Sequence, residues 1–270
     1  MDYKLIAFDM DDTLLDSHGE LSEANHQALD ELMARGIQVV LCSGRPTPSL
    51  LRSARKLLGD KPGEYIISFN GAAVCDVHSG KELIRTPLPS NAGLKILETA
   101  RTYNVLLQAY QGDNFYVEKE DPRVAKYSNA IGIPSTLVSD LSSIIFEGSL
   151  KLLMNGPREI LDRAYTTLKP RAEAGEFAMV FSKPEYLEFI HPQVNKGAGL
   201  QALCKLLGIP IEATIGVGDS YNDIEMLETA GLGIAVANAK DQVKAKAKMV
   251  LESNHDQSIV LEIKDKVFQF

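Results

Sequence analysis

Carboxylates at two places in the chain have the residue types and spacing of a metal or phosphate site. Asp9 and Asp11 follow an apolar run at residues 5–8, and Asp219 and Asp223 follow a second such run. Side chains two apart on a strand share a face, so Asp9 and Asp11 leave their strand together. Two carboxylates 4 Å apart repel by about 4 kcal/mol at an effective dielectric near 20, so a shared cleft requires a cation. Because the ligands are all oxygen, with no His or Cys among them, we expect Mg²⁺.

Two further segments suit the binding of a phosphate group. Ser43 and Gly44 follow a third apolar run and precede a helix expected to begin near Pro46. A hydroxyl and free backbone N–H groups at a helix N-terminus bind phosphate oxygens well. Lys196 supplies a cation at the beginning of another expected helix. A lysine, a magnesium ion and a helix N-terminus around one carboxylate predict a phosphate site with its own nucleophile.

Alternating apolar runs and helical repeats are expected to bring these segments together. Near the N-terminus, strands expected at residues 4–8 and 37–42 flank a helix that begins after Ser22 and ends before Gly36. The C-terminal third repeats the pattern. Helices are expected at residues 197–207, 222–230, 239–248 and 256–268, and strands at residues 214–217, 232–236 and 249–252. This pattern is typical of a parallel sheet with helices on both faces. Because ligands bind at the carboxyl ends of such strands, we expect the chemically competent segments at one sheet edge.

The middle of the chain has a different pattern. Its expected strands, at residues 115–117, 150–154 and 185–190, are more amphipathic, and helices are expected at residues 91–103, 121–131 and 157–168. This pattern favours an antiparallel sheet with helices on one face. We therefore predict a Rossmann-like α/β core formed by residues 1–84 and 191–270, with an inserted α+β domain at residues 85–190.

Composition limits the classes of partner. The chain has 270 residues, with 28 basic and 36 acidic side chains and a formal net charge of −8. That balance argues against nucleic-acid or anionic-membrane partners, which demand a basic surface. No apolar run approaches the roughly 18 residues of a membrane helix. The three cysteines, Cys42, Cys75 and Cys204, are far apart and lack metal-binding spacing, as expected in a reducing compartment. We therefore expect a cytoplasmic protein without a membrane or nucleic-acid partner, as a monomer or homodimer.

Together these segments resemble the motifs of a known family. In chain order they are Asp9-Met10-Asp11-Asp12-Thr13, Ser43-Gly44-Arg45, Lys196 and Gly218-Asp219-Ser220-Tyr221-Asn222-Asp223. They resemble the four motifs of haloacid dehalogenase (HAD) superfamily phosphatases in order and spacing. The large insert and residues 69–72 resemble the Cof-type branch of sugar-phosphate phosphatases. The resemblance implies a Mg²⁺-dependent phosphatase acting on a sugar phosphate or similar small phosphorylated metabolite.

The resemblance also implies catalytic and phosphate-binding roles. Asp9 is expected to attack phosphorus and form an aspartyl-phosphate, while Asp11 protonates the leaving oxygen and then deprotonates the hydrolytic water. Ser43 and Lys196 are expected to hold phosphoryl oxygens. Asn222 is expected to orient Ser43 or the phosphate. The full set of expected phosphate-binding residues is Met10, Ser43, Gly44, Lys196 and Asn222.

The same resemblance implies a metal site and a cap. Mg²⁺ is expected to be bound by the carboxylates of Asp9 and Asp219 and the backbone carbonyl of Asp11, with Asp223 as an outer or water-mediated partner. The insert is expected to close over the site and select the leaving group. Asp12 departs from the family pattern, which has Gly there, and we expect its side chain to point to solvent.

Two other functions use similar residues. A phosphoacceptor signalling protein of the receiver type would combine Asp, Mg²⁺, a hydroxyl and a lysine on a parallel sheet. Receiver modules are much shorter and lack an insert of this size, and Asp11 beside the nucleophile favours turnover over a long-lived phosphoaspartate. A catalytically idle ligand-binding protein on the same fold is the other alternative, which the complete acidic set disfavours and Asp12 keeps open.

Overall fold

A computed structural model describes residues 2–60 and 62–269 of the chain. It divides into two compact units: Met1–Ile84 with Asn195–Phe270, and Arg85–Val194. We call the first the core unit and the second the insert. The division after residue 84 coincides with the expected first boundary, whereas the second lies beyond residue 190. Residues 191–194 form a turn in which the Val194 N–H donates to the His191 carbonyl.

The core unit is built on an eight-stranded sheet with strand order β14-β13-β12-β1-β2-β3-β4-β5. Its strands are β1 (Leu5–Phe8), β2 (Gln38–Cys42), β3 (Tyr65–Ser68), β4 (Ala73–Asp76), β5 (Glu82–Arg85), β12 (Thr214–Gly218), β13 (Leu232–Ala235) and β14 (Met249–Val250). Neighbours from β14 to β3 are parallel, and β4 runs antiparallel to β3. The predicted parallel α/β core is confirmed.

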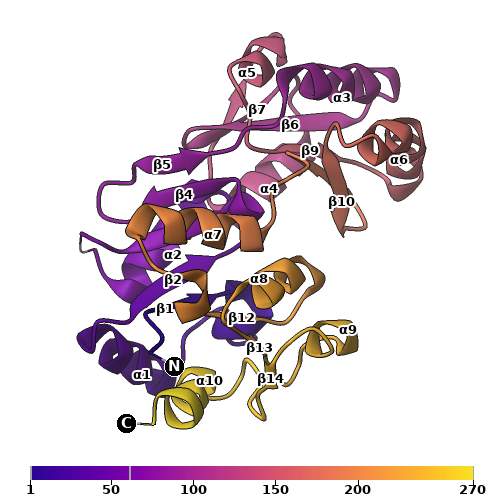
Figure 1. Ribbon diagram of the computed structural model, residues 1–270. Coiled ribbons are helices and arrows are strands. Elements are labelled where there is room, and N and C mark those ends of the chain that lie inside the picture. The colour runs from indigo at the N-terminus through magenta and orange to yellow at the C-terminus, as the bar shows by residue number, and fades with distance from the viewer. Residues whose placement is uncertain (1, 61, 270) are drawn as a thin grey trace. The chain divides into compact units, whose positions relative to one another are not determined.

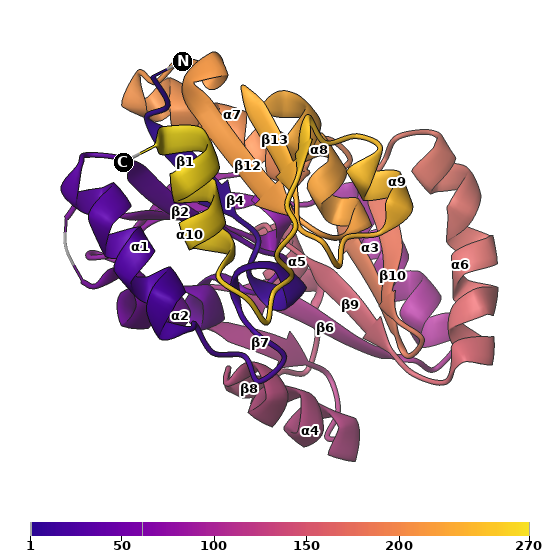
Figure 2. The same ribbon diagram turned by 90° about the horizontal axis from the view of Figure 1, so that it is seen from below.

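Helices cover both faces of this sheet (Figures 1 and 2). They are α1 (Glu23–Ala34), α2 (Thr47–Leu58), α7 (Lys196–Leu207), α8 (Ile224–Thr229), α9 (Asp241–Lys244) and α10 (Ile259–Ile263). Leu200 of α7 and Met226 of α8 pack with Leu5 and Ala7 of β1 on one face. On the other face, α1 and α2 pack against β2, and α10 packs against α1. All four residues of β1 are therefore buried between the two layers.

The C-terminal elements are shorter than the sequence pattern indicates. The helix expected at residues 239–248 is only α9, and the helix expected at 256–268 is α10 followed by a wider turn at Lys264–Phe268. The strand expected at residues 249–252 is the two-residue β14. The lysines of this stretch alternate with alanine, which favours a helix locally, but pairing with β13 determines the path of the chain.

The insert contains a six-stranded sheet with strand order β10-β11-β9-β6-β7-β8. Its elements are α3 (Ser90–Thr102), β6 (Leu106–Gln111), β7 (Asn114–Val117), α4 (Pro122–Ile131), β8 (Ser135–Leu137), α5 (Ser142–Phe146), β9 (Leu152–Asn155), α6 (Arg158–Glu173), β10 (Ala178–Lys183) and β11 (Tyr186–Ile190). Neighbouring strands are antiparallel except β7 and β8, which are parallel. The expected α+β class therefore describes this unit.

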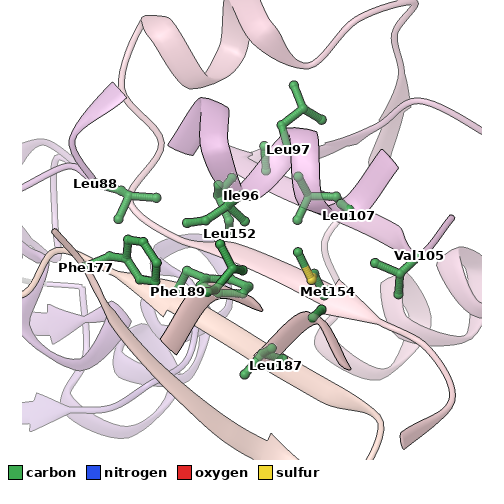
Figure 3. Close-up of a cluster of buried hydrophobic side chains, with 14 of the residues drawn as sticks. Leu88, Ile96, Leu97, Val105, Leu107, Leu152, Met154, Phe177, Leu187 and Phe189 are labelled. Atoms are coloured by element: carbon green, nitrogen blue, oxygen red, sulfur yellow. The ribbon is translucent and has the colours of Figure 1, made fainter. Parts of the chain in front are cut away.

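One face of the insert sheet forms an apolar core with α3, α5 and α6. Figure 3 shows Ile96 and Leu97 of α3 above Leu152, Leu187 and Phe189 of the sheet. The expectation that all helices lie on one face is wrong for α4. Its Tyr127 packs edge-on against Phe115 and Tyr186, whose side chains lie on the opposite face of the sheet.

Candidate active site

The carboxyl ends of β1, β2 and β12 place the first site residues at one edge of the core sheet. Phe8 pairs in parallel register with Leu41 and with Val217, so the chain leaves these three strands at the same level. Asp9 comes directly after β1, and its N–H donates to the Val217 carbonyl. Ser43 comes directly after β2. The parallel sheet therefore brings together residues far apart in the sequence.

Three carboxylates form a buried acidic triad at this edge. Asp9, Asp219 and Asp223 each offer an oxygen, and these oxygens lie within 4.8 Å of one another. Lys196, whose side chain is fully buried, donates to Asp9 and to Asp223 Oδ1, the latter at 2.5 Å. One ammonium therefore faces three carboxylates in a buried place, which leaves the group with excess negative charge.

Burial and the neighbouring charges together shift the pKa values of these groups. Burial raises the pKa of Asp9 to about 7, with Asp223 and Asp219 adding to that rise and Lys196 opposing it. Burial also raises the pKa of Asp219, although hydrogen bonds from Ser220 and Thr13 oppose the shift. For Lys196, burial opposes the charged form, but Asp9 and Asp223 outweigh it and hold the pKa above its ordinary value. Such perturbed groups are typical of functional sites.

Local hydrogen bonds fix the two later carboxylates. Thr13 Oγ1 donates to Asp219 Oδ1 at 3.0 Å, and Ser220 Oγ donates to the other oxygen at 2.7 Å. Asp223 Oδ2 accepts the backbone N–H groups of Asp219 and Ser220. A Cβ at Gly218 would lie 2.5 Å from the Asp223 carboxyl carbon, so this glycine lets Asp223 lie beneath the turn. No pattern in the sequence indicates that Thr13 contacts Asp219.

Lys196 is buried because its helix begins in a tightly packed place. The Asn195 side chain caps α7 by accepting the Ala198 N–H. A Cβ at Gly71 would lie 2.1 Å from the Asn195 carbonyl, and one at Gly197 would lie 2.4 Å from the Glu225 carbonyl. Two glycines therefore allow the beginning of α7 to approach its neighbours, which directs Lys196 into the acidic triad.

A turn at residues 69–71 supports the expected phosphate-binding segment. Phe69 and Asn70 both have left-handed backbone conformations, with φ of 50° and 56°. The Asn70 N–H donates to the Ser43 carbonyl, and a Cβ at Gly44 would lie 3.0 Å from Asn70 Oδ1. Asn222 Nδ2 donates to the same Asn70 oxygen at 3.1 Å. Asn222 therefore reaches Asn70, whose position the sequence suggested only through the segment 69–72.

The remaining expected site residues lie outside the triad. Asp11 is exposed and forms a two-pronged ion pair with Arg45. Asp12 is exposed, as expected, with a left-handed φ of 58° and its carbonyl accepting from Asn238 Nδ2. The Met10 side chain is fully buried, so only its backbone is suited to contact a ligand.

The donor set of the triad fits a hard divalent cation. All the side-chain groups are carboxylates, they are close together, and a single lysine leaves them underneutralised. A dication would favour the ionised form of Asp9 and so oppose the burial, and the repulsion from Asp223 and Asp219, that raise its pKa. Beside that cation, an ionised Asp9 next to a buried lysine has the features of a nucleophile for an anionic electrophile such as a phosphate.

Comparison with known proteins gives a consistent result. A family model described as haloacid dehalogenase-like hydrolase matches residues 6–263. The crystal structure of a haloacid dehalogenase-like hydrolase from Bacteroides thetaiotaomicron has 30% sequence identity and a TM-score of 0.88, covering 98% of this chain and 100% of the other. Phosphatase YwpJ of Bacillus subtilis is 28% identical, covering 95% of this chain and 97% of its own length.

A further relative carries a substrate in its name. The 5-amino-6-(5-phospho-D-ribitylamino)uracil phosphatase YitU of Bacillus subtilis is 29% identical, covering 97% of this chain and 96% of its own length. The predicted enzyme class, a phosphatase, is thus confirmed. The family model describes hydrolases, and the two Bacillus subtilis relatives are named phosphatases. Within residues 2–60 and 62–269, no helix combines the length and apolar composition needed to cross a membrane.

Proposed function

The chain belongs to the haloacid dehalogenase-like hydrolase family, and we propose that it hydrolyses phosphate monoesters of small metabolites with Mg²⁺ through an aspartyl-phosphate. The observation that carries this proposal is the buried triad of Asp9, Asp219 and Asp223 around Lys196. Sugar phosphates and similar small phosphorylated metabolites are the proposed substrates, and the cytoplasm, where such metabolites occur, is the proposed location.

The triad also supports the proposed metal site. The carboxylates of Asp9 and Asp219 and the backbone carbonyl of Asp11 would hold Mg²⁺. Asp223 already accepts from Lys196 and from two backbone N–H groups, which favours an outer position for it. When bound, Mg²⁺ supplies positive charge that stabilises the phosphoryl oxygens and keeps Asp9 ionised.

In the first half-reaction an Asp9 oxygen attacks phosphorus in line with the ester oxygen. The bond between phosphorus and Asp9 forms as the bond to the leaving oxygen breaks, and that oxygen takes a proton from Asp11 to leave as an alcohol. Lys196, the Ser43 hydroxyl and the backbone N–H groups of Met10 and Gly44 bind the phosphoryl oxygens as charge moves through the transition state.

In the second half-reaction a water molecule attacks phosphorus and gives its proton to Asp11. The bond between phosphorus and Asp9 breaks, which releases inorganic phosphate and restores both carboxyl groups to their starting states. The Asn222–Asn70 contact supports the Ser43–Gly44 segment in both steps. The insert is proposed to act as a cap that excludes water and selects the leaving group.

The name of one relative supports the substrate class. YitU is named for the phosphoester of a ribityl-substituted uracil, a small metabolite that carries a phosphorylated polyol chain. We propose that this chain acts on a phosphoester of comparable size.

The proposal is tested by phosphate release from a panel of sugar phosphates, nucleotides and phosphorylated cofactor precursors, with Mg²⁺ and with EDTA. We expect Mg²⁺-dependent release from one or a few compounds. A stable phosphoenzyme without release would favour a phosphoacceptor protein, and binding of phosphate without either reaction would favour an idle ligand-binding protein. Either of these results would contradict the proposed hydrolysis.

A further inference from the structure

Asp11 and Arg45 form an ion pair at the surface of the core unit, and the mechanism above gives Arg45 no role. Arg45 Nε donates to Asp11 Oδ2 at 2.9 Å, and Nη2 donates to Oδ1. Both prongs of the guanidinium thus hold both oxygens of one carboxylate. The Arg45 side chain is 31% exposed and the Asp11 side chain is 56% exposed. A pair of this geometry fixes the direction of a carboxylate more tightly than a lysine would.

The backbone around Asp11 gives its side chain little support. Asp11 has an extended conformation inside the irregular segment Met10–Leu14, and the next residue, Asp12, is left-handed. Asp11 is more than half exposed, so packing does not define its rotamer. Its carboxylate direction therefore depends on a polar partner, and Arg45 is well placed to provide it.

Arg45 is itself fixed from several directions. Its Nη1 donates to Ser53 Oγ of α2 at 3.3 Å, and its backbone N–H donates to Ser43 Oγ at 3.2 Å. Its carbonyl accepts the Phe69 N–H at 3.0 Å. The guanidinium therefore ties Asp11 to α2 and to the segment that carries Ser43.

The place of the Asp11 carboxylate matches the demands of in-line transfer. The nucleophile and the leaving oxygen lie on opposite sides of phosphorus, so the acid that protonates the leaving oxygen must stand clear of the nucleophile. Asp9 points to Lys196 within the buried triad, whereas Asp11 points to Arg45 outside it.

We infer that Arg45 is a positioning residue, whose guanidinium holds the Asp11 carboxylate clear of the acidic triad and directed to exchange a proton with the leaving oxygen. This inference rests on the proposed phosphatase function. Arg45 acts through Asp11, so its removal slows both steps in which Asp11 moves a proton. It spares attack by Asp9 on a substrate whose leaving group needs no proton. Because an exposed ion pair contributes little to folding, the loss of Arg45 leaves the fold intact.

The test compares two substrates that differ in their need for a proton. One is a sugar phosphate that the wild-type enzyme hydrolyses, and the other is p-nitrophenyl phosphate, whose leaving group departs without protonation. For Arg45→Ala we expect the rate of phosphoenzyme formation in a single turnover to fall about 100-fold with the sugar phosphate and less than about 5-fold with p-nitrophenyl phosphate. Hydrolysis of the phosphoenzyme, which needs Asp11 as a base after either substrate, should slow equally with both. Arg45→Lys keeps the charge but loses the paired donors of the guanidinium, so its rates are expected to lie between those of the wild type and Arg45→Ala.

A double-mutant cycle tests whether Arg45 acts through Asp11. If it does, Asp11→Asn with Arg45→Ala is no slower than Asp11→Asn alone. Additive losses, or an equal fall in phosphoenzyme formation with both substrates, would show that Arg45 contacts the substrate directly and would overturn the inference. An unchanged rate of phosphoenzyme formation from the sugar phosphate would overturn it as well.

Two controls separate this inference from its premise. Arg52→Ala removes an exposed arginine from α2, the helix that carries Ser53, and is expected to retain the wild-type rates with both substrates. Thermal unfolding of each variant confirms that the fold is retained, and Arg45→Lys carries the test if Arg45→Ala does not fold. Failure of the wild-type enzyme to hydrolyse either substrate would overturn the proposed function and this inference together. Hydrolysis by the wild type with an insensitive Arg45→Ala would overturn the inference alone.

Discussion

The two units of the molecule each bury a lysine, and the two lysines differ in the number of carboxylates around them. In the core unit, Lys196 contacts Asp9 and Asp223 and lies beside a third carboxylate, Asp219. In the insert, Lys151 pairs with Glu188 at 3.3 Å and lies 5.0 Å from the centre of the Tyr110 ring. The first group has an excess of negative charge, whereas the second is an ion pair of equal charges.

The difference separates a reactive centre from a structural one. Burial opposes the charged form of both lysines, and nearby carboxylates outweigh it in both, so both pKa values are raised. In the core group, burial also raises the pKa of a carboxyl, Asp9, to about 7. Excess negative charge of this kind favours the binding of a cation, and that cation can in turn bind an anionic substrate. A balanced buried pair requires neither. The following predictions test that contrast.

The largest effect is expected from Asp9→Asn, which removes the proposed nucleophile. Turnover should fall by at least about 10⁴-fold, because no other carboxylate in the triad is placed to replace it. The folded state should remain, since Asn fills the same volume without a buried charge. The measurement is phosphate release together with thermal unfolding, and the finding of near wild-type turnover would rule out the proposed nucleophile.

Replacing each buried lysine by methionine compares the two groups directly. Lys196→Met should reduce kcat about 10³-fold and destabilise the metal-free protein by roughly 3–5 kcal/mol, because it leaves a buried acidic triad. Lys151→Met should cost about 1–3 kcal/mol, because it leaves one carboxylate, Glu188, which is 12% exposed and keeps a hydrogen bond from Ser182. Denaturant unfolding gives both values.

Magnesium distinguishes the two lysine variants, because a bound cation is expected to replace the lost lysine charge at the acidic triad and not beside Glu188. Added Mg²⁺ should recover part of the stability lost in Lys196→Met and none of that lost in Lys151→Met. Lys205→Met, at an exposed position of α7, serves as the matched control with little change. Equal recovery of both lysine variants would show that the charge balance does not distinguish the two units.

The pH dependence of stability should reveal the raised pKa of the Asp9 carboxyl. Its pKa in the folded protein, about 7, is raised from an ordinary value of 3.8. Its contribution to stability is therefore fully present below pH 3.8 and is lost as pH rises through about 7. In EDTA, the stability difference between wild type and Asp9→Asn should shift against wild type as pH rises from 5 to 8.

Magnesium should reverse that trend, because the cation and the proton compete for Asp9. The increase in melting temperature caused by Mg²⁺ should be larger at pH 8 than at pH 6, as measured by calorimetry. An increase that is the same at both pH values, or that persists unchanged in Asp9→Asn, would place the ion elsewhere.

The smallest effect is expected from Asp12→Gly. Glycine accepts the left-handed conformation at this position without the cost of a Cβ, but it gains entropy in the unfolded chain, so stability should change by no more than about 1 kcal/mol. Activity should be equal or slightly higher, because Asp12 is exposed while its charge still raises the pKa of Asp219. Steady-state kinetics test this, and a large loss would show that Asp12 faces the substrate.

The sequence predicts the core fold well because its signature is local. Short apolar runs such as Leu5–Phe8 can only be strands covered on both faces, and the parallel order of β1, β2 and β12 follows from the helices between them. The insert was harder to predict. The side on which α4 packs depends on Tyr127 contacting Phe115 and Tyr186, which no local pattern reveals.

The candidate site shows the same division. The motif order indicated that Asp9, Lys196, Asp219 and Asp223 share a site, and the structure brings all four together. A sequence pattern alone favours a solvated surface position for Lys196, and its complete burial depends on the packing of Gly71 and Gly197. The pairings of Arg45 with Asp11 and Asn70 with Asn222 join distant segments through side chains, so only coordinates reveal them.

The central claim, that Asp9 carries the phosphoryl group, is tested most directly by trapping the intermediate. The enzyme would be mixed with a radiolabelled substrate, quenched in acid within one turnover, and digested for mass spectrometry. We expect phosphate on the peptide that contains Asp9 in the wild type and none on that peptide in Asp9→Asn. Turnover with no labelled peptide, or label on a different residue, would contradict it.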